Sequence, residues 1–226
     1  MNNRINYLLL VTLLAGLVSC QPSIDKQEEK AASKAQEIIT SAIETHGGKL
    51  YGNVLLSFDF RDRHYTAFRK NGQYVYTLEF TDPTGQVKDV LDNEGFYREI
   101  NGSKVELPEE KENAYANSVN SVIYFALLPH GLNDAAVNKE YLGETTIHDQ
   151  PYHKIKITFD QEGGLRFREA HNVRNINGIM FSDYINYESA SDTTTLDKLD
   201  MAFKNSGLKN LSSIDLKNIT VKNENL

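Results

Sequence analysis

After residue 30, the apolar positions of the chain first follow a helical spacing. Residues 31–46 carry one apolar stripe, and Gly47-Gly48 follows directly. The stripe consists of Ala35, Ile38, Ile39, Ala42, Ile43 and His46. Such positions share one face of a helix, and glycine readily takes the left-handed conformation that ends one. The pattern therefore predicts an amphipathic helix over 31–46.

From residue 54 onward, apolar and polar residues alternate. The apolar positions are Val54, Leu56, Phe58 and Phe60, then Tyr74, Tyr76, Leu78 and Phe80. A period of two is typical of strands with one buried face. Asn71-Gly72 and Asn101-Gly102 are strong hairpin signals, and residues 82–85 (DPTG) have the composition of a tight turn. We predict an antiparallel meander of about six strands with one apolar face.

A second stretch of helical spacing interrupts the strands. Its apolar positions are Tyr115, Val119, Val122, Ile123, Ala126 and Leu127, and Pro129 and Gly131 follow them. Further strands are predicted at 141–145, 152–159, 165–170, 172–175, 179–187 and 214–221, with a loop at 189–198. No repeat or domain boundary is visible. The chain is predicted to form one α+β domain over 31–226, with an antiparallel sheet packed against the N-terminal helix and the interrupting helix.

The apolar face of this sheet leaves two interpretations open. The helices can fill its concave side completely, or they can leave a cavity for a ligand. Inward-facing aromatic side chains suit both arrangements. The candidate lining residues of an apolar pocket are Phe58, Phe60, Tyr74, Tyr76 and Phe80.

The N-terminal segment carries an export pattern. Arg4 precedes an apolar run over 8–18, and Leu17-Val18-Ser19 is followed by Cys20, the only cysteine in the sequence. The run is about eleven residues, short of the roughly 20 that a membrane-spanning helix needs. A charged start, a short apolar core and small residues are typical of a signal peptide. We predict a lipoprotein signal peptide over 1–19 and lipidation of Cys20, rather than a buried or unpaired thiol.

Charge and composition limit the partners. Residues 20–30 are predicted to form a lipidated tether, because they are polar and lack apolar periodicity. Removal of the signal peptide takes away one positive charge, so the mature net charge is −7 − 1 = −8. An acidic domain without a basic cluster argues against nucleic acid. The expected partners are a membrane, through the anchor, and either an apolar or lipid ligand or an envelope protein.

Motifs of catalysis are absent from the sequence. It holds no G-x-S-x-G, H-E-x-x-H, C-x-x-C or phosphate-binding glycine loop. His148 and His153 flank a predicted turn with Asp149, and a metal site there is the alternative to solvated turn residues. We predict no catalytic residue, no metal and no cofactor.

Two arginine-rich strings have two interpretations. Residues 60–64 read FRDRH, and Arg166 and Arg168 fall on one face of a predicted strand. Such side chains usually pair with carboxylates across the sheet, and Asp183 is one candidate partner. Alternatively, Arg166 and Arg168 form a cationic rim that captures an anionic head group, since a guanidinium suits carboxylate and phosphate.

Several strings also carry a family resemblance. They are THGG (45–48), SFDFR (57–61), SVNSVIYFALLP (118–129), FDQEGG (159–164) and RFREAHNVRNINGI (166–179). Together they resemble an uncharacterised family of Bacteroidota lipoproteins, a domain of unknown function, over residues 35–187. The resemblance implies an architecture similar to the lipoprotein-localisation carrier fold. That fold is a curved antiparallel half-barrel capped by helices around an apolar groove.

The sequence departs from this family at one point. In the family, the Glu-Gly-Gly string is followed by an acidic, tryptophan-containing strand pair, whereas here Gly164 leads directly into Leu165, and the chain has no tryptophan. We expect a half-barrel that lacks two wall strands and exposes new sheet edges.

Three classes of function follow from the sequence. The prediction is a non-enzymatic outer-membrane lipoprotein that binds a lipid or other apolar ligand in a half-barrel groove. The alternative is a structural lipoprotein with a filled core that docks an envelope partner. An enzyme is disfavoured. The periplasmic face is the expected location, and cell-surface export, which acidic residues after the lipidated cysteine mark in Bacteroidota, is the alternative.

Overall fold

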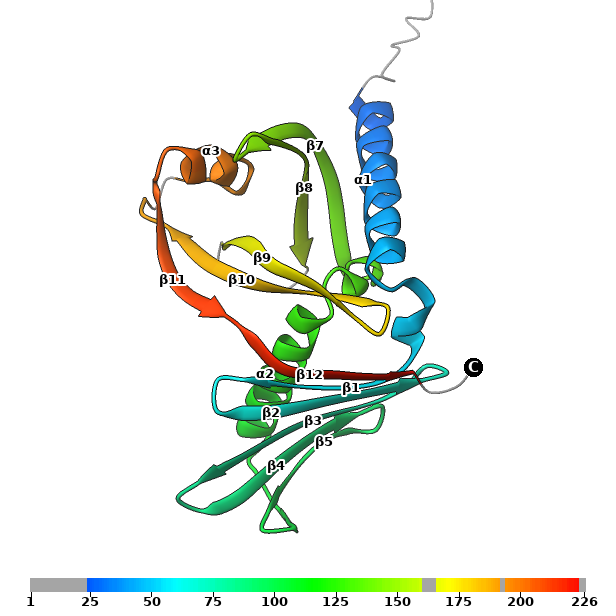
Figure 1. Ribbon diagram of the computed structural model, residues 1–226, viewed down its shortest axis with the longest axis vertical. Coiled ribbons are helices and arrows are strands. Elements are labelled where there is room, and N and C mark those ends of the chain that lie inside the picture. Colours follow the sequence, from blue (N-terminus) through cyan, green and yellow to red (C-terminus); the bar gives the residue numbers. More distant parts are fainter. Residues whose placement is uncertain (1–23, 160–165, 192–193, 224–226) are drawn as a thin grey trace, which may run out of the picture.

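A computed structural model describes residues 24–159, 166–191 and 194–223 (Figure 1). The first element, α1 (Ile24–His46), confirms the helix predicted at 31–46 and starts earlier. The segment predicted as a tether is therefore helical from Ile24 on. The predicted signal peptide and Cys20 lie outside the described residues.

A seven-stranded antiparallel sheet forms the lower half of the molecule in Figure 1. Its order is β12-β1-β2-β3-β4-β5-β6. The strands are β1 (Asn53–Phe60), β2 (Arg63–Lys70), β3 (Gln73–Asp82), β4 (Gly85–Asp92), β5 (Gly95–Ile100), β6 (Ser103–Val105) and β12 (Leu216–Asn223). Asn71 and Asn101 have positive φ in the β2–β3 and β5–β6 turns, as the Asn-Gly pairs predict. The predicted six-stranded meander is confirmed as β1–β6.

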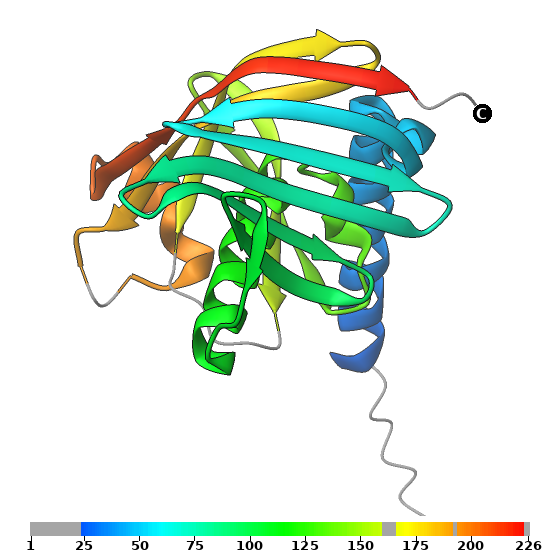
Figure 2. The same cartoon turned by 90° about the horizontal axis from the view of Figure 1, so that it is seen from below.

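The core of this sheet is closed by the helix that interrupts the strands. Helix α2 (Glu109–Ala126) contacts β3, β4 and β5. Its buried residues Val119 and Ile123 share one cluster with Leu56 and Phe58 of β1. The period-two pattern of the strands and the 3.6-residue pattern of the helix thus meet in one apolar layer. Seen from below, the sheet curves across the molecule and both long helices lie on one side of it (Figure 2).

The upper half of the molecule contains two smaller antiparallel units (Figure 1). One is the hairpin of β7 (Val137–Ile147) and β8 (Gln150–Phe159), against which α1 packs. The other is a sheet in the order β11-β10-β9. Its strands are β9 (Phe167–Ile176), β10 (Ile179–Ser189) and β11 (Leu208–Ile214).

The sequence pattern missed parts of this upper half. The strands predicted at 165–170 and 172–175 are one strand, β9. The short helix α3 (Leu199–Lys204) and strand β11 were not predicted, and three 3-10 turns lie at Gly48–Gly52, His130–Asn133 and Leu196–Lys198. Strands β8 and β9, on either side of residues 160–165, belong to different sheets, and within the described chain each pairs on one side only. Whether these edges result from a strand pair that other family members have stays a prediction.

A buried carboxylate joins the upper sheet to the lower one. Asp183 of β10 accepts hydrogen bonds from Asn172 (2.6 Å), Arg174 (2.9 Å) and the backbone N–H of Leu216 (2.9 Å). Burial by itself raises the pKa of Asp183, but these donors outweigh it and hold the pKa below its usual value. The pairing of a carboxylate with an arginine of the 166–174 string is thus realised at Arg174.

The fold class is confirmed as α+β, with a curved, open antiparallel sheet packed against helices. Among the described residues, no helix is both long enough and apolar enough to span a membrane.

Candidate functional site

A cavity of about 190 Å³ lies between the C-terminal half of α2 and the upper sheet. Its wall comes from both sheets, from α2 and from the β1–β2 turn. The lining residues are Phe60, Arg61, Val122, Phe125, Ala126, Arg168, Tyr184, Asn186, Ser212, Ile214 and Leu216. The cavity therefore lies where the two halves of the molecule meet.

The strand register explains the polar side of this wall. Arg168 of β9 pairs with Asn186 of β10, which in turn pairs with Ser212 of β11. Residues that pair directly across antiparallel strands project from the same face of the sheet. The upper sheet thus presents this row of polar side chains, with Tyr184 and Ile214 beside it, to the cavity.

Helix α2 supplies the apolar side. Its residues Val122, Phe125 and Ala126 follow the i, i+3, i+4 spacing of one helix face. Ala126 also belongs to the core cluster with β1, whereas Val122 and Phe125 are half-buried. Helix α2 therefore closes the lower core with one face and lines the cavity with the next.

Arg168 is the most unusual residue of the site. Its guanidinium lies 4.0 Å from the centre of the Phe125 ring, and its Nε is buried without a hydrogen-bond partner. In the described part of the chain, no carboxylate forms an ion pair with it. Burial, together with the repulsion from Arg166, lowers the pKa of Arg168. An arginine remains charged at neutral pH in spite of this.

Two further polar groups near Arg168 also lack partners. The Oδ1 of Asn186 and the hydroxyl of Tyr124 are both buried without a hydrogen bond. Burial raises the pKa of Tyr124 to about 12, and Arg168 opposes this shift. Buried polar groups in folded proteins are nearly always paired, so three such atoms in one neighbourhood indicate a missing partner.

Two of the seven predicted ligand-binding residues, Phe60 and Arg168, lie on this cavity. Arg166 is exposed just before β9 and lies outside the lining. The structure thus separates the two arginines that the sequence placed together. The ligand-binding role of each remains a prediction.

The other four predicted residues pack in or on the lower core. Phe58 and Tyr76 are buried in it, and Tyr74 and Phe80 pack against it. The Tyr76 hydroxyl accepts a hydrogen bond from Arg69 at 2.8 Å. The sequence left two interpretations open for the apolar face of this sheet, a filled core or a pocket. Beside these four residues, α2 packs against that face.

Sequence reasoning missed the α2 and β10–β11 residues of the cavity. Val122 was recognised only as part of a helical stripe, and Phe125 interrupts that stripe. The sequence does contain one signal for them. The apolar stripe of this helix, from Val119 through Val122 to Ala126, is wider than packing against a single sheet requires.

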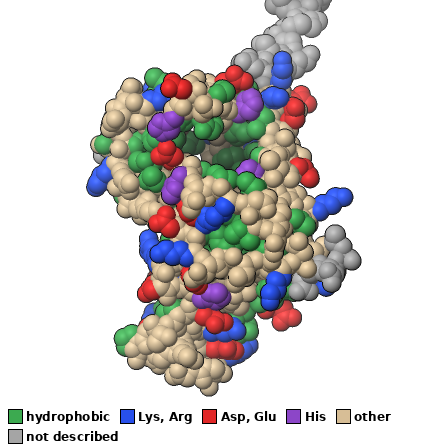
Figure 3. All heavy atoms as spheres, in the orientation of Figure 1, with side chains coloured by type: hydrophobic (Ala, Val, Ile, Leu, Met, Phe, Trp, Pro, Cys, Tyr) green, Lys and Arg blue, Asp and Glu red, His purple; other side chains and the backbone are tan. Residues whose placement is uncertain are grey.

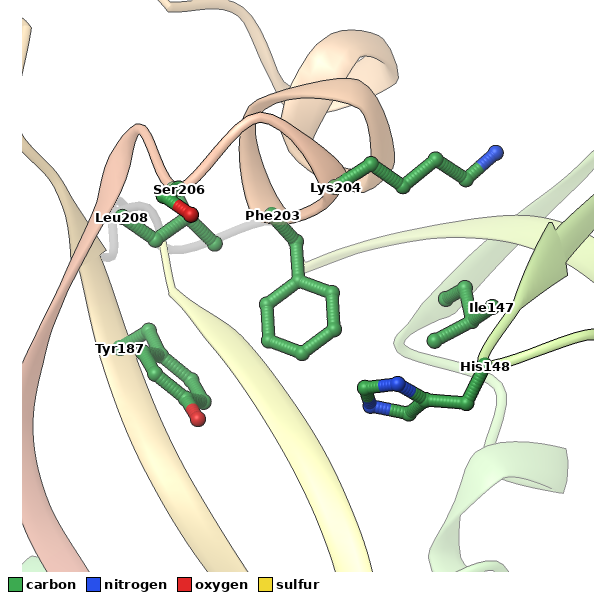
Figure 4. A pocket seen from close by; sticks show the side chains of 7 residues that line it. All are labelled: Ile147, His148, Tyr187, Phe203, Lys204, Ser206 and Leu208. Carbon is green, nitrogen blue, oxygen red and sulfur yellow. The ribbon is translucent and has the colours of Figure 1, made fainter.

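A second, larger cleft of about 480 Å³ lies below α3. Figure 4 shows Phe203 pointing down between Tyr187 and His148. The polar groups here have partners: Glu169 bonds both His148 and Tyr187 at 3.0 Å, and Lys204 donates to Thr145. The space-filling view also shows a hollow with hydrophobic side chains at the place of β7 and β8 (Figure 3). Because these polar groups bond one another, we interpret this cleft as a packing contact between the β7–β8 hairpin and the upper sheet.

The histidines of the alternative metal site have other neighbours. His148 bonds Glu169, and His153 lies 3.3 Å from the Tyr141 hydroxyl and 3.6 Å from Glu144. Among the residues with described positions, no group of three metal-ligating side chains is present.

The chain matches a family of unknown function, DUF6503, over residues 8–164. Because this match covers more than half of the chain, the chain belongs to that family. Neither the curated proteins nor the solved structures yielded a match. The matched segment ends before β9, so Arg168 and the rest of the upper-sheet lining lie beyond it.

Proposed function

We propose that this protein is a membrane-anchored envelope lipoprotein that binds a lipid or other apolar ligand in the cavity beside α2. One observation carries the proposal: α2 packs into the core cluster where it contacts β3–β5, whereas its surface toward the upper sheet lines a cavity. Protein interiors are close-packed, so an apolar opening between packed elements is a candidate site for a small ligand.

The predicted anchor sets the role of such a site. Lipidation of Cys20 by a diacylglycerol and a further acyl chain holds a domain at one membrane, because each buried methylene contributes about 0.8 kcal/mol. A permanently anchored domain does not ferry a ligand between membranes. The proposal is therefore a receptor or acceptor at the outer membrane, on its periplasmic face.

Exposed apolar side chains favour a second candidate, an interaction lipoprotein that docks an envelope protein. Tyr152 and Phe159 of β8 are each 50% exposed, and Val173 of β9 is 54% exposed. Both strands have an unpaired edge within the described chain, and such edges are sites of strand addition by a partner.

The test is native mass spectrometry of the mature chain carrying Cys20→Ser, purified without detergent. A ligand-binding module retains a co-purifying apolar molecule or takes up an added one with a defined stoichiometry. Val122→Phe, which places a ring in the cavity, abolishes that uptake, whereas Asn120→Phe on the exposed side of α2 leaves it unchanged. Absence of uptake by the unmodified chain overturns the proposal in favour of the docking function.

A further inference from the structure

The geometry points to a ligand with an acidic head group: an amphiphile with one short alkyl chain and a carboxylate that Arg168 binds. This inference rests on the proposed function and specifies the ligand of the same cavity. It follows from the charges on the wall, from the free atom of Arg168 and from the size of the cavity.

The described wall of the cavity carries positive charge. Arg61 and Arg168 line it, and none of the lining residues in the described part of the chain is Asp or Glu. Arg61 is exposed, so it lies at the mouth, whereas Arg168 is half-buried against Phe125. A cation in this cavity meets repulsion from both residues, and an anion is attracted by both.

The cost of burying Arg168 is the strongest argument. A buried charge without a partner is costly, and folded proteins pair it. Arg98 and Arg174 follow that rule, with Asp89 and Asp183 as their partners. Arg168 has no carboxylate in the described part of the chain, and a carboxylate supplied by a ligand completes the same pair.

The atom of Arg168 that lacks a hydrogen-bond partner, Nε, is one of the two that an arginine uses to bind a carboxylate. Arg98 holds Asp89 with two parallel bonds, from Nε to Oδ1 (2.6 Å) and from Nη2 to Oδ2 (2.7 Å). This fork is the strong, planar mode in which arginine binds a carboxylate. In Arg168 the Nε is buried and unused. The ligand carboxylate takes the place at Arg168 that Asp89 takes at Arg98.

A neighbouring polar group fits the same head group. Tyr124, whose buried hydroxyl also lacks a partner, is close enough to Arg168 to affect its pKa, but it is not among the lining residues of the cavity. The amide of Asn186, directly across the strands from Arg168, presents a donor when its oxygen and nitrogen exchange places. A carboxylate has acceptor sites for both the Arg168 guanidinium and this amide.

The size of the cavity limits the chain. A volume of about 190 Å³ holds about six water-sized groups, and a methylene is of similar size. About six of the ten non-hydrogen atoms of octanoate fill this space along Val122, Ala126 and Ile214, and the rest of the molecule extends out of the cavity opening. 1-Octanol has the same number of carbon atoms and a neutral head group, so the two compounds separate the role of the chain from the role of the charge.

The experiment is calorimetric titration of octanoate and of 1-octanol into the mature chain carrying Cys20→Ser. We expect octanoate to bind about 10- to 100-fold more tightly than 1-octanol, the range for a hydrogen-bonded charge. Arg168→Gln removes this preference and keeps the affinity for 1-octanol. Lys222→Gln, which removes one exposed positive charge on β12, leaves both affinities unchanged.

The outcomes distinguish the two claims. Equal affinities for the two compounds, or a preference that survives in Arg168→Gln, overturn the head-group inference while leaving the apolar site standing. Absence of binding by both compounds overturns the proposed function as well. Should Arg168→Gln not fold, Arg168→Lys keeps the charge but loses the fork, and a preference reduced at least threefold is then expected.

Discussion

Two arginines that contact the same helix at different turns show how the two regions of the molecule differ. Arg98 lies 3.7 Å from the ring centre of Tyr115, near the start of α2, and Arg168 lies 4.0 Å from that of Phe125, near its end. Both side chains thus stack on an aromatic residue of α2. Arg98 has Asp89 as a bidentate partner, whereas Arg168 has no carboxylate partner among the described residues.

Arg98 thus forms a buried ion pair within the lower core, whereas Arg168 has no such ion pair among the described residues. The side chains of Arg98 and Asp89 are only 12% and 2% exposed, and their hydrogen bonds raise the pKa of Arg98. Burial lowers the pKa of Arg168 instead. Both arginines stack on an aromatic ring, so this contact does not explain the difference. We infer that the carboxylate partner determines whether the charge stabilises the fold.

The largest expected effect is on stability at Arg98. Arg98→Gln leaves the carboxylate of Asp89 buried without its partner, and we expect the free energy of unfolding to fall by about 3–5 kcal/mol. Arg168→Gln removes a charge that has no carboxylate partner among the described residues, so we expect a change below about 1 kcal/mol or a gain. Urea denaturation of both variants measures the difference. Equal losses contradict the distinction between the two sites.

The next largest effect on stability is expected at Asp183, which forms an ion pair with Arg174 as Asp89 does with Arg98. Asp183→Asn weakens three hydrogen bonds at the junction between the sheets, and we expect a loss of about 2 kcal/mol at pH 7. Because the folded-state pKa of Asp183 is lowered, its contribution is complete above the unfolded pKa near 4 and is lost as pH falls through the folded value.

Urea midpoints at pH 7 and pH 3 test this pH dependence. The unmodified protein loses more stability toward pH 3 than Asp183→Asn does. An identical loss in both proteins contradicts the role given to this carboxylate.

Equal enlargements on the two faces of α2 give a third comparison. Val119→Phe forces a ring into the closed core, where overpacking costs about 1–3 kcal/mol. Val122→Phe places the same ring in the cavity, and we expect a cost below about 1 kcal/mol. Thermal unfolding of the two variants is the measurement. A larger loss for Val122→Phe shows that the cavity is not available to a ligand.

The smallest effect is expected at the mouth of the cavity. Arg61 is exposed, and exposed charges contribute about 0–1 kcal/mol and are screened by salt. Arg61→Gln should weaken octanoate binding about two- to threefold at low salt, a difference that vanishes at about 1 M salt. A loss that persists at high salt places Arg61 inside the site.

Much of the lower half could be predicted from the sequence. The alternation from Val54 to Phe80 and the Asn-Gly pairs specify β1–β6, because register and turn type follow from them. The upper half could not be predicted as well. β9 is interrupted by Asn172, which has positive φ and marks a bulge, and β11 has no buried residue to give an alternating pattern.

The candidate site was predicted only in part, for a related reason. The sequence analysis named Phe60 and Arg168 as candidate ligand-binding residues. It did not show which arginine has no carboxylate partner among the described residues. That depends on register: Arg98 faces Asp89 across β4–β5, whereas Arg168 faces Asn186 across β9–β10. The irregular pairing at Asn172 shifts the β9–β10 register, so the Asn177-Gly178 turn alone does not indicate which residue faces Arg168.

The most direct test of the central claim is the stabilisation of the folded protein by octanoate, compared between the unmodified chain and Arg168→Gln. A ligand at about 100 times its dissociation constant raises the free energy of unfolding by about 2.7 kcal/mol. At the same octanoate concentration, we predict this full gain for the unmodified chain and about 0.4–1.4 kcal/mol for Arg168→Gln, which corresponds to the 10- to 100-fold loss of affinity. Equal gains in the two proteins contradict the claim that Arg168 binds the head group of the ligand.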